Sequence, residues 1–173
     1  AAPWLAACKY DDSFSNSPSN LLTFAVDTLS MDTVFSTVPV ATKSFWIFNR
    51  SGDGLRCNRV YLKNGNQSGF RVNVDGEFLS PEHGYMLTDV EVRKGDSIRV
   101  FVELTSRLQG SDLPKEVSDN LVFLYESGKE QQVCLRAWSW DAIKLNDLEV
   151  KDTYTLSGKK PILVYGNIKV DSL

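Results

Sequence analysis

Apolar and polar residues alternate along most of this chain, and this period of two constrains the fold more than any other feature of the sequence. Phe70, Val72 and Val74 alternate with polar neighbours, and residues 98–104 continue the pattern. Successive side chains of a β-strand point to opposite sides, so each run offers one apolar face to a core. Further strand candidates are residues 22–31, 44–49, 57–62, 89–93, 121–125 and 132–138. No run has convincing helical spacing, so we expect an all-β fold.

Turn sequences rich in Gly, Asn and Asp separate these runs. They are Ser51-Gly52-Asp53-Gly54, Asn64-Gly65-Asn66, Lys94-Gly95-Asp96-Ser97 and Ser127-Gly128-Lys129. Glycine supplies the positive φ that tight connections need, and Asp or Ser side chains bond to nearby backbone groups. The chain has 173 residues, of which 42% are hydrophobic, and this suits one domain with a real core. We therefore predict an immunoglobulin-like antiparallel β-sandwich of about 7–8 strands over residues 22–140.

Three segments fit the alternation less simply. Residues 44–49 are apolar at nearly every position, which predicts a central strand covered on both sides, and residues 108–118, with Pro114, indicate a loop between sheets. Residues 141–154 are charged and irregular, whereas residues 162–165 and 168–170 indicate short strands. Residues 141–173 are therefore expected to form a C-terminal extension, a short strand appendage to the sandwich.

The N-terminal Leu5-Ala6-Ala7-Cys8 has the pattern of a bacterial lipoprotein processing site, in which an aliphatic and two small residues precede a cysteine. Residues 1–7 are then the remnant of a signal peptide, and Cys8 is the residue that carries the lipid. The alternative is that these residues are simply a small apolar start to the chain. No apolar run approaches the ~18 residues of a membrane span, so Cys8 would provide the membrane attachment. A stable anchor needs more than one acyl chain.

Residues 8–21 are rich in Ser, Asn, Asp and Pro and bury little apolar surface, which predicts a flexible, lipidated tether. Asp11 and Asp12 follow the cysteine closely. In lipoproteins of Bacteroidetes, such acidic residues are associated with export to the outer cell surface. By this analogy we expect an outer-membrane, surface-exposed protein.

Longer stretches resemble a family of Bacteroidetes surface lipoproteins in which an immunoglobulin-like domain of the ASPM, SPD-2 and Hydin type precedes a parallel β-helix. The matching stretches are residues 22–35, 70–76, 95–103, 137–138 and 164–173. The last of them, Val164 to Leu173, resembles the family's lead-in to the β-helix. No β-helix repeats follow in this sequence, so any function carried by the β-helix is not transferred by the resemblance. The shared motifs look structural rather than catalytic.

The composition and the scattered polar residues point to no reaction. The formal charge of −3, without a basic cluster, argues against a nucleic-acid partner. His83, the only histidine, lies in a turn-like sequence without further metal ligands or the elbow motif of a serine hydrolase. Two carboxylate pairs at alternate positions, Asp75 with Glu77 and Asp89 with Glu91, have the spacing of one strand face. In an acidic protein such pairs are usually the solvated side of a sheet, and we expect neither an enzyme nor a cofactor beyond the covalent lipid.

Cys57 and Cys134 are the cysteines that remain if Cys8 is lipidated. A disulfide between them would close a loop of nearly 80 residues and stabilise the fold by roughly 4 kcal/mol in the chain-entropy model. Alternation, however, predicts that Val133, Leu135 and Ala137 point toward the core, which places Cys134 on the opposite face of the strand. We therefore expect two unpaired cysteines.

Trp138 and Trp140 share one strand face and, with Trp46, offer aromatic surface that could stack on sugars. The alternative is that Trp138 packs over a sheet edge or against the C-terminal strands, which leaves Trp140, at a strand end, as the better candidate for exposure and contact. Four short motifs of Asp, Ser or Thr, and an aliphatic residue resemble the O-glycan attachment motif of exported Bacteroidetes proteins. Their candidate acceptors are Thr28, Thr33, Ser97 and Ser172.

Two hypotheses for function remain. The first is a non-enzymatic, lipid-anchored protein of the cell envelope whose sandwich binds other envelope proteins or an extracellular ligand. The second is a carbohydrate-binding accessory lipoprotein beside an outer-membrane glycan uptake complex. Binding of a glycan that is lost on Trp140→Ala would favour the second hypothesis.

Overall fold

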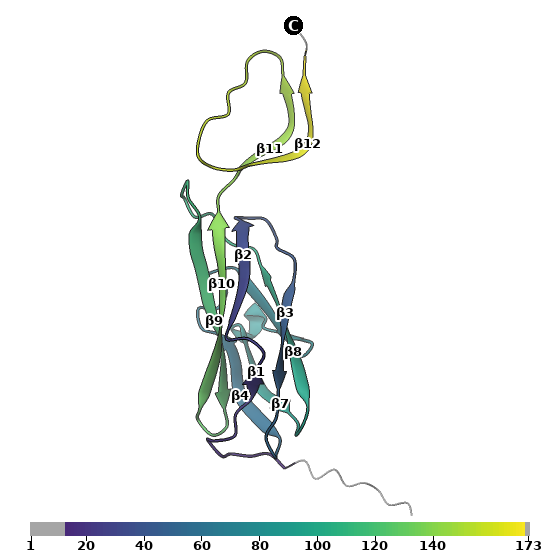
Figure 1. Ribbon diagram of the computed structural model, residues 1–173, viewed down its shortest axis with the longest axis vertical. Coiled ribbons are helices and arrows are strands. Elements are labelled where there is room, and N and C mark those ends of the chain that lie inside the picture. Colours follow the sequence, from purple (N-terminus) through teal and green to yellow (C-terminus); the bar gives the residue numbers. More distant parts are fainter. Residues whose placement is uncertain (1–12, 172–173) are drawn as a thin grey trace, which may run out of the picture.

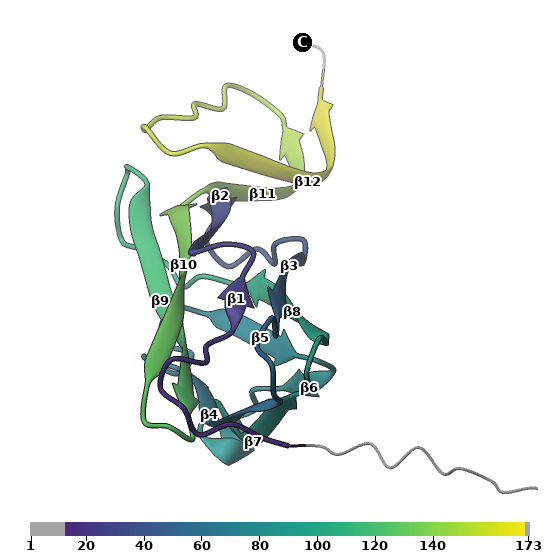
Figure 2. The same ribbon diagram turned by 60° about the horizontal axis from the view of Figure 1, so that its bottom comes forward.

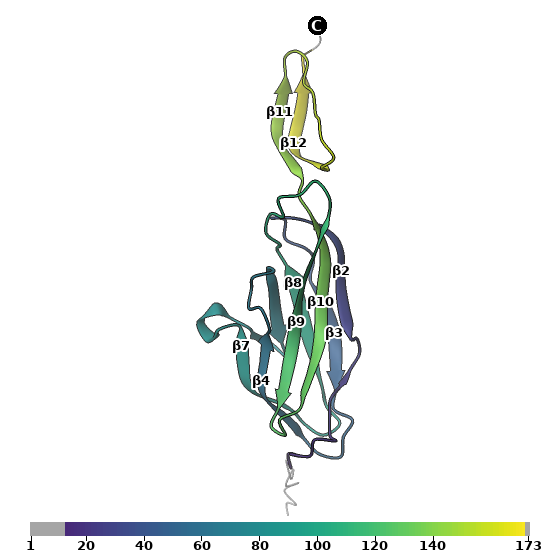
Figure 3. The same ribbon diagram turned by 90° about the vertical axis from the view of Figure 1, so that its left-hand side faces the viewer.

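The computed structural model describes residues 13–171, which form two five-stranded sheets and a two-stranded extension. The β3–β8 sheet contains, in spatial order, β1 (Thr23–Phe24), β3 (Lys43–Phe48), β8 (Ser97–Leu104), β5 (Phe70–Val74) and β6 (Glu77–Phe78). The β9–β10 sheet contains β2 (Thr28–Phe35), β10 (Glu130–Trp140), β9 (Lys115–Tyr125), β4 (Leu55–Leu62) and β7 (Met86–Val92). Figure 1 shows the sheets from one side, and Figure 3 shows β9 and β10 in front of them.

The two sheets form the predicted immunoglobulin-like β-sandwich. Eight of its ten strands have five residues or more, in agreement with the expected number, and β1 and β6 have two each. All pairings inside the sheets are antiparallel except one, because β2 runs parallel to β10. One edge of the sandwich is thus formed by the first long strand lying beside the last.

The core lies between the sheets and is built by the alternation seen in the sequence. Phe70, Val72 and Val74 of β5 are buried, as are all four aliphatic residues of β8 that face inward. Residues 44–49 are not covered on both sides, because Phe45 and Ile47 are buried whereas Trp46 is exposed. The prediction for this strand was wrong, since no layer of the described chain covers the outer face of the β3–β8 sheet.

The turn before β8 is formed as the sequence indicated, and strand β9 begins earlier than expected. Gly95 has a φ of 73°, and the backbone N–H of Ser97 donates to Asp96 Oδ1 over 2.7 Å, so Lys94-Gly95-Asp96-Ser97 is a tight connection. β9 begins at Lys115, directly after Pro114, so the predicted loop over residues 108–118 ends four residues early. Proline cannot donate to a ladder, and here it lies just outside the strand.

Residues 13–21, which the sequence assigns to a flexible tether, lie against the sandwich. Phe14 forms a β-bridge with Gly54, the N–H of Ser15 donates to Gly54 O over 2.9 Å, and the Arg56 guanidinium lies 4.6 Å from the centre of the Phe14 ring. The apolar ring of Phe14 gives this polar segment a contact that its composition did not suggest. The tether prediction is therefore corrected for residues 13–21, and residues 8–12 lie outside the described part.

The C-terminal extension consists of two parallel strands beyond the end of β10, β11 (Ile143–Val150) and β12 (Ile162–Val170) (Figure 1). Both strands bend part-way along their length (Figure 2), and their register shifts between Asn146 and Leu148. Asp147 and Gly166, with φ of 46° and 78°, adopt left-handed conformations there. The segment predicted to be irregular thus contains a strand, and the two short strands predicted at the C-terminal end are one bent strand.

No helix between residues 13 and 171 is long and apolar enough to cross a membrane. The only helical element described is a 3-10 turn at Pro81–His83.

Candidate functional site

The residues proposed for membrane attachment and for one glycan lie outside the described part of the chain. Cys8 precedes residue 13 and Ser172 follows residue 171. The lipidation site and this acceptor therefore stay predictions.

Trp138 and Trp140 project from the outer face of the β9–β10 sheet, and their exposures are the reverse of those expected. Trp138 is 45% exposed and pairs with Thr33 on one side and Glu116 on the other. Trp140 is half-buried, and its indole N–H donates to the carbonyl of Asp112 over 2.9 Å. Trp46 lies on the outer face of the other sheet, so the three tryptophans do not form one aromatic surface.

The three described acceptors for O-glycans occupy different settings. Thr33 is exposed at the open edge of the β9–β10 sheet, and Thr28 is half-buried on the same strand. Ser97 is half-buried at the start of β8. Thr33 therefore offers its hydroxyl most openly, directly beside Trp138.

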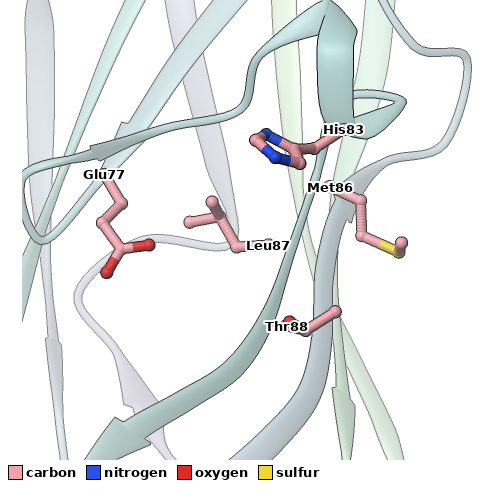
Figure 4. Close-up of a pocket in the computed structure, with 5 residues that line it drawn as sticks. All are labelled: Glu77, His83, Met86, Leu87 and Thr88. Atoms are coloured by element: carbon pink, nitrogen blue, oxygen red, sulfur yellow. The ribbon is translucent and has the colours of Figure 1, made fainter.

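A cavity of about 350 Å³ lies between β6, the 3-10 turn and β7, and the single histidine is among the residues that line it (Figure 4). Glu77 and His83 approach it from opposite sides of Leu87. His83 is exposed, and its Nδ1 lies 3.0 Å from Ser80 Oγ within the 3-10 turn. Nδ1 of the imidazole is thus held in a local turn contact, and Leu87 lies between His83 and Glu77 in Figure 4.

Of the two carboxylate pairs that the sequence indicated, Asp89 and Glu91 share strand β7, whereas Asp75 and Glu77 do not share a strand. Asp75 lies in the turn between β5 and β6 with a φ of 51°, so it is not on one strand face with Glu77. Both line a cavity of about 110 Å³ together with Asp89 and Glu91 of β7. Glu91 is bound to Arg56 over 2.7 Å. Within residues 13–171 no three His, Cys, Asp or Glu side chains gather closely enough to hold a metal ion.

The two described cysteines are free, as the alternation predicted. Cys57 is buried in β4, whereas Cys134 is half-buried on the outer face of β10. β9 separates their two strands. Burial raises the pKa of the Cys57 thiol to about 12, which keeps it protonated and unreactive.

Two buried carboxylates are structural features that the sequence did not reveal. Asp141, at the end of β10, accepts hydrogen bonds from Ser36 Oγ (2.7 Å) and from the backbone N–H groups of Gln109 (2.8 Å), Gly110 (2.8 Å) and Ser111 (3.3 Å). Burial alone would raise the pKa of Asp141, but these hydrogen bonds lower it overall. Asp119 has fewer donors, and burial raises its pKa. Asp141 thus ties the 107–114 loop and the end of β2 to the start of the extension.

Strand β12 carries the largest group of exposed aliphatic side chains in the described part of the chain, and these face aliphatic side chains of β11. Aliphatic residues pair with each other across the two strands, and we call these four pairs the aliphatic ladder. They are Ile143 with Ile162, Leu145 with Val164, Leu148 with Ile168, and Val150 with Val170. Paired residues of neighbouring strands lie on the same side, so each pair is one apolar contact. On β12 these side chains are between 40% and 68% exposed, whereas on β11 Leu145 is buried and the other three are half-buried, so the ladder is open to solvent on its β12 side.

The edges of this pair of strands are open as well. In the described chain β11 and β12 pair only with each other, so each has a free row of backbone N–H and C=O groups. Natural proteins usually cover such edges or protect them with charges. An open edge beside exposed aliphatic side chains is the arrangement that receives a further strand.

No protein-family profile matches the chain, and a comparison with curated protein sequences finds no match. Several solved structures are similar to it. A protein of unknown function from Porphyromonas gingivalis W83 is 12% identical with a TM-score of 0.48 over 68% of this chain and 46% of the other. The ASH/PapD-like domain of human CEP192 is 10% identical with a TM-score of 0.44 over 73% and 90%. The secreted serine protease VesC from Vibrio cholerae is 13% identical with a TM-score of 0.46 over 72% and 24%.

This chain thus spans about half the length of the Porphyromonas protein. At these identities the likeness concerns the fold and not activity or ligands.

Proposed function

We propose that this protein is a non-enzymatic, lipid-anchored module of the cell envelope that binds another envelope protein or an extracellular protein through β11 and β12. The aliphatic ladder is the observation that carries the proposal. Burying such side chains against a partner lowers the free energy by roughly 25 cal/mol for each Å² of apolar surface removed from water. Exposed apolar patches of this kind mark interaction sites.

The shape of the molecule fits a module that holds this surface away from its anchor. The described chain starts beside Gly54 at one end of the sandwich, and β11 and β12 extend from the opposite end (Figure 1). The Leu5-Ala6-Ala7-Cys8 pattern supports a lipid on Cys8. An anchor there would lie at the end remote from the ladder, so the ladder would remain accessible at the outer-membrane surface. Membership in the Bacteroidetes lipoprotein family that the sequence resembles is part of this proposal.

The test of the binding surface compares two substitutions on the extension. Ile168→Lys places a charge in the ladder, whereas Asn146→Lys places one at a position that pairs with Tyr165 between the aliphatic pairs. Crosslinking in native membranes, followed by mass spectrometry, identifies the neighbouring chain. We expect that Ile168→Lys abolishes this crosslink and that Asn146→Lys retains it. An unchanged crosslink in Ile168→Lys would rule out the ladder as the binding surface.

The anchor is tested on the mature protein. Mass spectrometry of native protein should find Cys8 as the first residue, with acyl chains attached, and Cys8→Ser should release the protein from the membrane. Finding residues 1–7 intact on unlipidated native protein would contradict the anchor and leave the test of the ladder unaffected.

The second hypothesis, a carbohydrate-binding lipoprotein, places its site elsewhere. Trp140 donates its indole N–H to Asp112 and is half-buried, so Trp138 alone offers an open ring on the β9–β10 sheet. The outer face of the β3–β8 sheet carries more exposed aromatic side chains than this surface does.

A further inference from the structure

The outer face of the β3–β8 sheet carries four aromatic side chains, which together we call the aromatic face. They are Trp46 and Phe48 of β3, Phe101 of β8 and Phe78 of β6. Trp46, Phe78 and Phe101 are 42%, 45% and 37% exposed. The rings of Trp46 and Phe48 are stacked with their centres 6.5 Å apart. No described segment covers this side of the sandwich.

Arg99 lies between two of these rings. Its guanidinium carbon is 5.2 Å from the centre of the Trp46 ring and 5.0 Å from that of Phe101. Its Nε and Nη2 donate to Ser44 Oγ over 3.2 and 2.9 Å, which fixes the plane of the guanidinium group. Nη1 has no acceptor among residues 13–171, so Arg99 offers positioned donors at the centre of the aromatic face.

A hollow of about 230 Å³ adjoins this arrangement and lies between Phe78 and Phe101. Its polar lining comes from Arg71, Asn73 and Glu103, and Arg71 Nη2 donates to Glu103 Oε2 over 2.5 Å. Asn73 Oδ1 accepts the N–H of Gly76 over 2.9 Å, and its Nδ2 has no acceptor in the described chain. Drug-sized ligands occupy pockets of roughly 300–1,000 Å³. This hollow is smaller, so it suits one six-membered ring of a longer ligand whose remainder lies on the open sheet.

The charge of this face is opposite to that of the whole chain. Strand alternation directs Arg71, Arg99 and Glu103 outward. Arg50, two residues after the end of β3, also reaches this face, because its guanidinium carbon lies 5.3 Å from the centre of the Phe48 ring. Glu103 compensates Arg71, whereas Arg50 and Arg99 have no carboxylate within ion-pair distance among the described residues. The face therefore has an excess of positive charge in a protein whose formal net charge is −3.

From this geometry we infer that the aromatic face binds a glycan chain that carries carboxylate groups. The apolar face of a sugar ring packs on Phe78 or Phe101, and its hydroxyl groups bond to the planar groups of Arg71, Asn73 and Glu103. A carboxylate on the glycan meets Arg99, whose guanidinium suits bidentate recognition. The site is separate from β11 and β12, so this inference does not depend on the proposed protein-binding surface.

Single-stranded nucleic acid is the other chain that stacks on aromatic and arginine side chains. Its regular phosphates call for several cations along a groove, as in other nucleic-acid sites. Here only two guanidinium groups are uncompensated, and Glu103 lies in the hollow, where it would repel a phosphate. The observations therefore favour sparse carboxylates over regularly spaced phosphates.

The test is calorimetric titration of the full chain with oligosaccharides of galacturonate and of glucuronate, with their methyl esters as neutral controls. We expect at least one uronate to bind and its methyl ester to bind at least about tenfold more weakly. Phe101→Ala should weaken uronate binding about tenfold or more, since the ring supplies the stacking surface. Arg99→Gln should weaken the uronate to the level of its ester and leave the ester unchanged.

Trp138→Ala is the matched control, because it removes an exposed ring of similar accessibility from the opposite sheet. It should leave uronate binding unchanged, and the thermal midpoints of all three variants should stay close to that of the wild type. Four results would overturn the inference: no uronate binds, Phe101→Ala binds as the wild type does, the esters bind equally well, or oligo-dT binds more tightly than every uronate.

Discussion

The sandwich and the C-terminal extension are built from the same kind of residue pattern, but only the sandwich buries its apolar side on every strand of five residues or more, whereas β12 leaves its aliphatic side chains exposed. Val72, Val100 and Val102 of the β3–β8 sheet are fully buried, whereas Val164 and Val170 of β12 are 47% and 68% exposed. Alternation specifies a strand and the side that prefers to be buried. It does not specify what covers that side, and in the extension the apolar side chains of β12 remain exposed within residues 13–171.

The largest expected difference between the two regions comes from deleting an apolar side chain. Phe70 is fully buried between the sheets, so Phe70→Ala should reduce the free energy of unfolding by about 3–5 kcal/mol. Ile168 is 49% exposed, so Ile168→Ala should change it by no more than about 0.5 kcal/mol. Chemical denaturation followed by tryptophan fluorescence measures both. A loss above about 2 kcal/mol for Ile168→Ala would mean that the extension is part of the cooperative core.

The second comparison uses two glycines that face equally close neighbours. A Cβ at Gly69 would lie 2.1 Å from the backbone oxygen of Thr105, and one at Gly166 would lie 2.1 Å from Asp147 Oδ1. Both have a positive φ, of 87° and 78°. The backbone of Thr105 is held within the sandwich, whereas the Asp147 side chain can rotate away at the loss of one exposed hydrogen bond, from the N–H of Asn167 to its Oδ1 over 3.1 Å.

Gly69→Ala should therefore reduce the stability of the whole sandwich by about 1–3 kcal/mol or more. Gly166→Ala should act locally, with faster hydrogen exchange at β11 and β12 amides and little change in global unfolding. Equal global losses for the two variants would show that the extension unfolds together with the sandwich.

These comparisons also show how much of the structure was predictable from the sequence. Alternation located strands β5 and β8 closely and indicated the free state of Cys57 and Cys134, because each depends on which side of a strand faces the core, whereas β3 was located by its run of apolar residues. It missed β11, where the apolar positions change phase between Leu145 and Leu148 around the left-handed Asp147. A phase shift of this kind breaks the period of two and makes a strand look irregular.

The candidate sites were less predictable, because they combine strands that are distant in the sequence. The aromatic face joins β3, β8 and β6, and only the sheet order β3-β8-β5-β6 brings these strands together. A sequence reading could identify Trp46 as an aromatic residue but could not assign it to the sheet opposite Trp138. The four donors to Asp141 likewise come from the end of β2 and from a loop about 30 residues before it in the chain.

The third prediction concerns Asp141, which lies where the two regions join. Asp141→Asn removes the negative charge and puts an amide donor where the carboxylate accepts up to four hydrogen bonds. Hydrogen bonds to charged groups contribute about 1.5–3 kcal/mol each in favourable cases, and we expect Asp141→Asn to reduce the free energy of unfolding by about 1–3 kcal/mol. Thermal unfolding at neutral pH measures it, and Asp112→Asn, at an exposed position in the neighbouring loop, is the control that should stay near zero.

The lowered pKa of Asp141 fixes the sign of the pH dependence. A carboxyl group with a lower pKa in the folded state stabilises the fold fully above its unfolded pKa, near 3.9. This contribution is lost as the pH falls through the folded pKa. The stability advantage of the wild type over Asp141→Asn should therefore shrink as the pH is lowered from 5 toward 2. An advantage that stays constant over this range would mean that the charge of Asp141 does not contribute.

The smallest effect is expected in the chemical protection of the two cysteines, which reports whether a change in the extension reaches the sandwich. Cys57 is buried with a pKa of about 12, whereas Cys134 is half-buried at the surface. Iodoacetamide should alkylate Cys134 in the folded protein and Cys57 only when the sandwich opens. Ile168→Lys disturbs the extension alone and should leave the alkylation rate of Cys57 unchanged. Gly69→Ala raises the fraction of molecules in which the sandwich is open, and the alkylation rate of Cys57 should increase by the same factor. Faster alkylation of Cys57 in Ile168→Lys would mean that the ladder contributes to the stability of the sandwich. The two regions would then differ in how far they bury their apolar side chains, but they would unfold together.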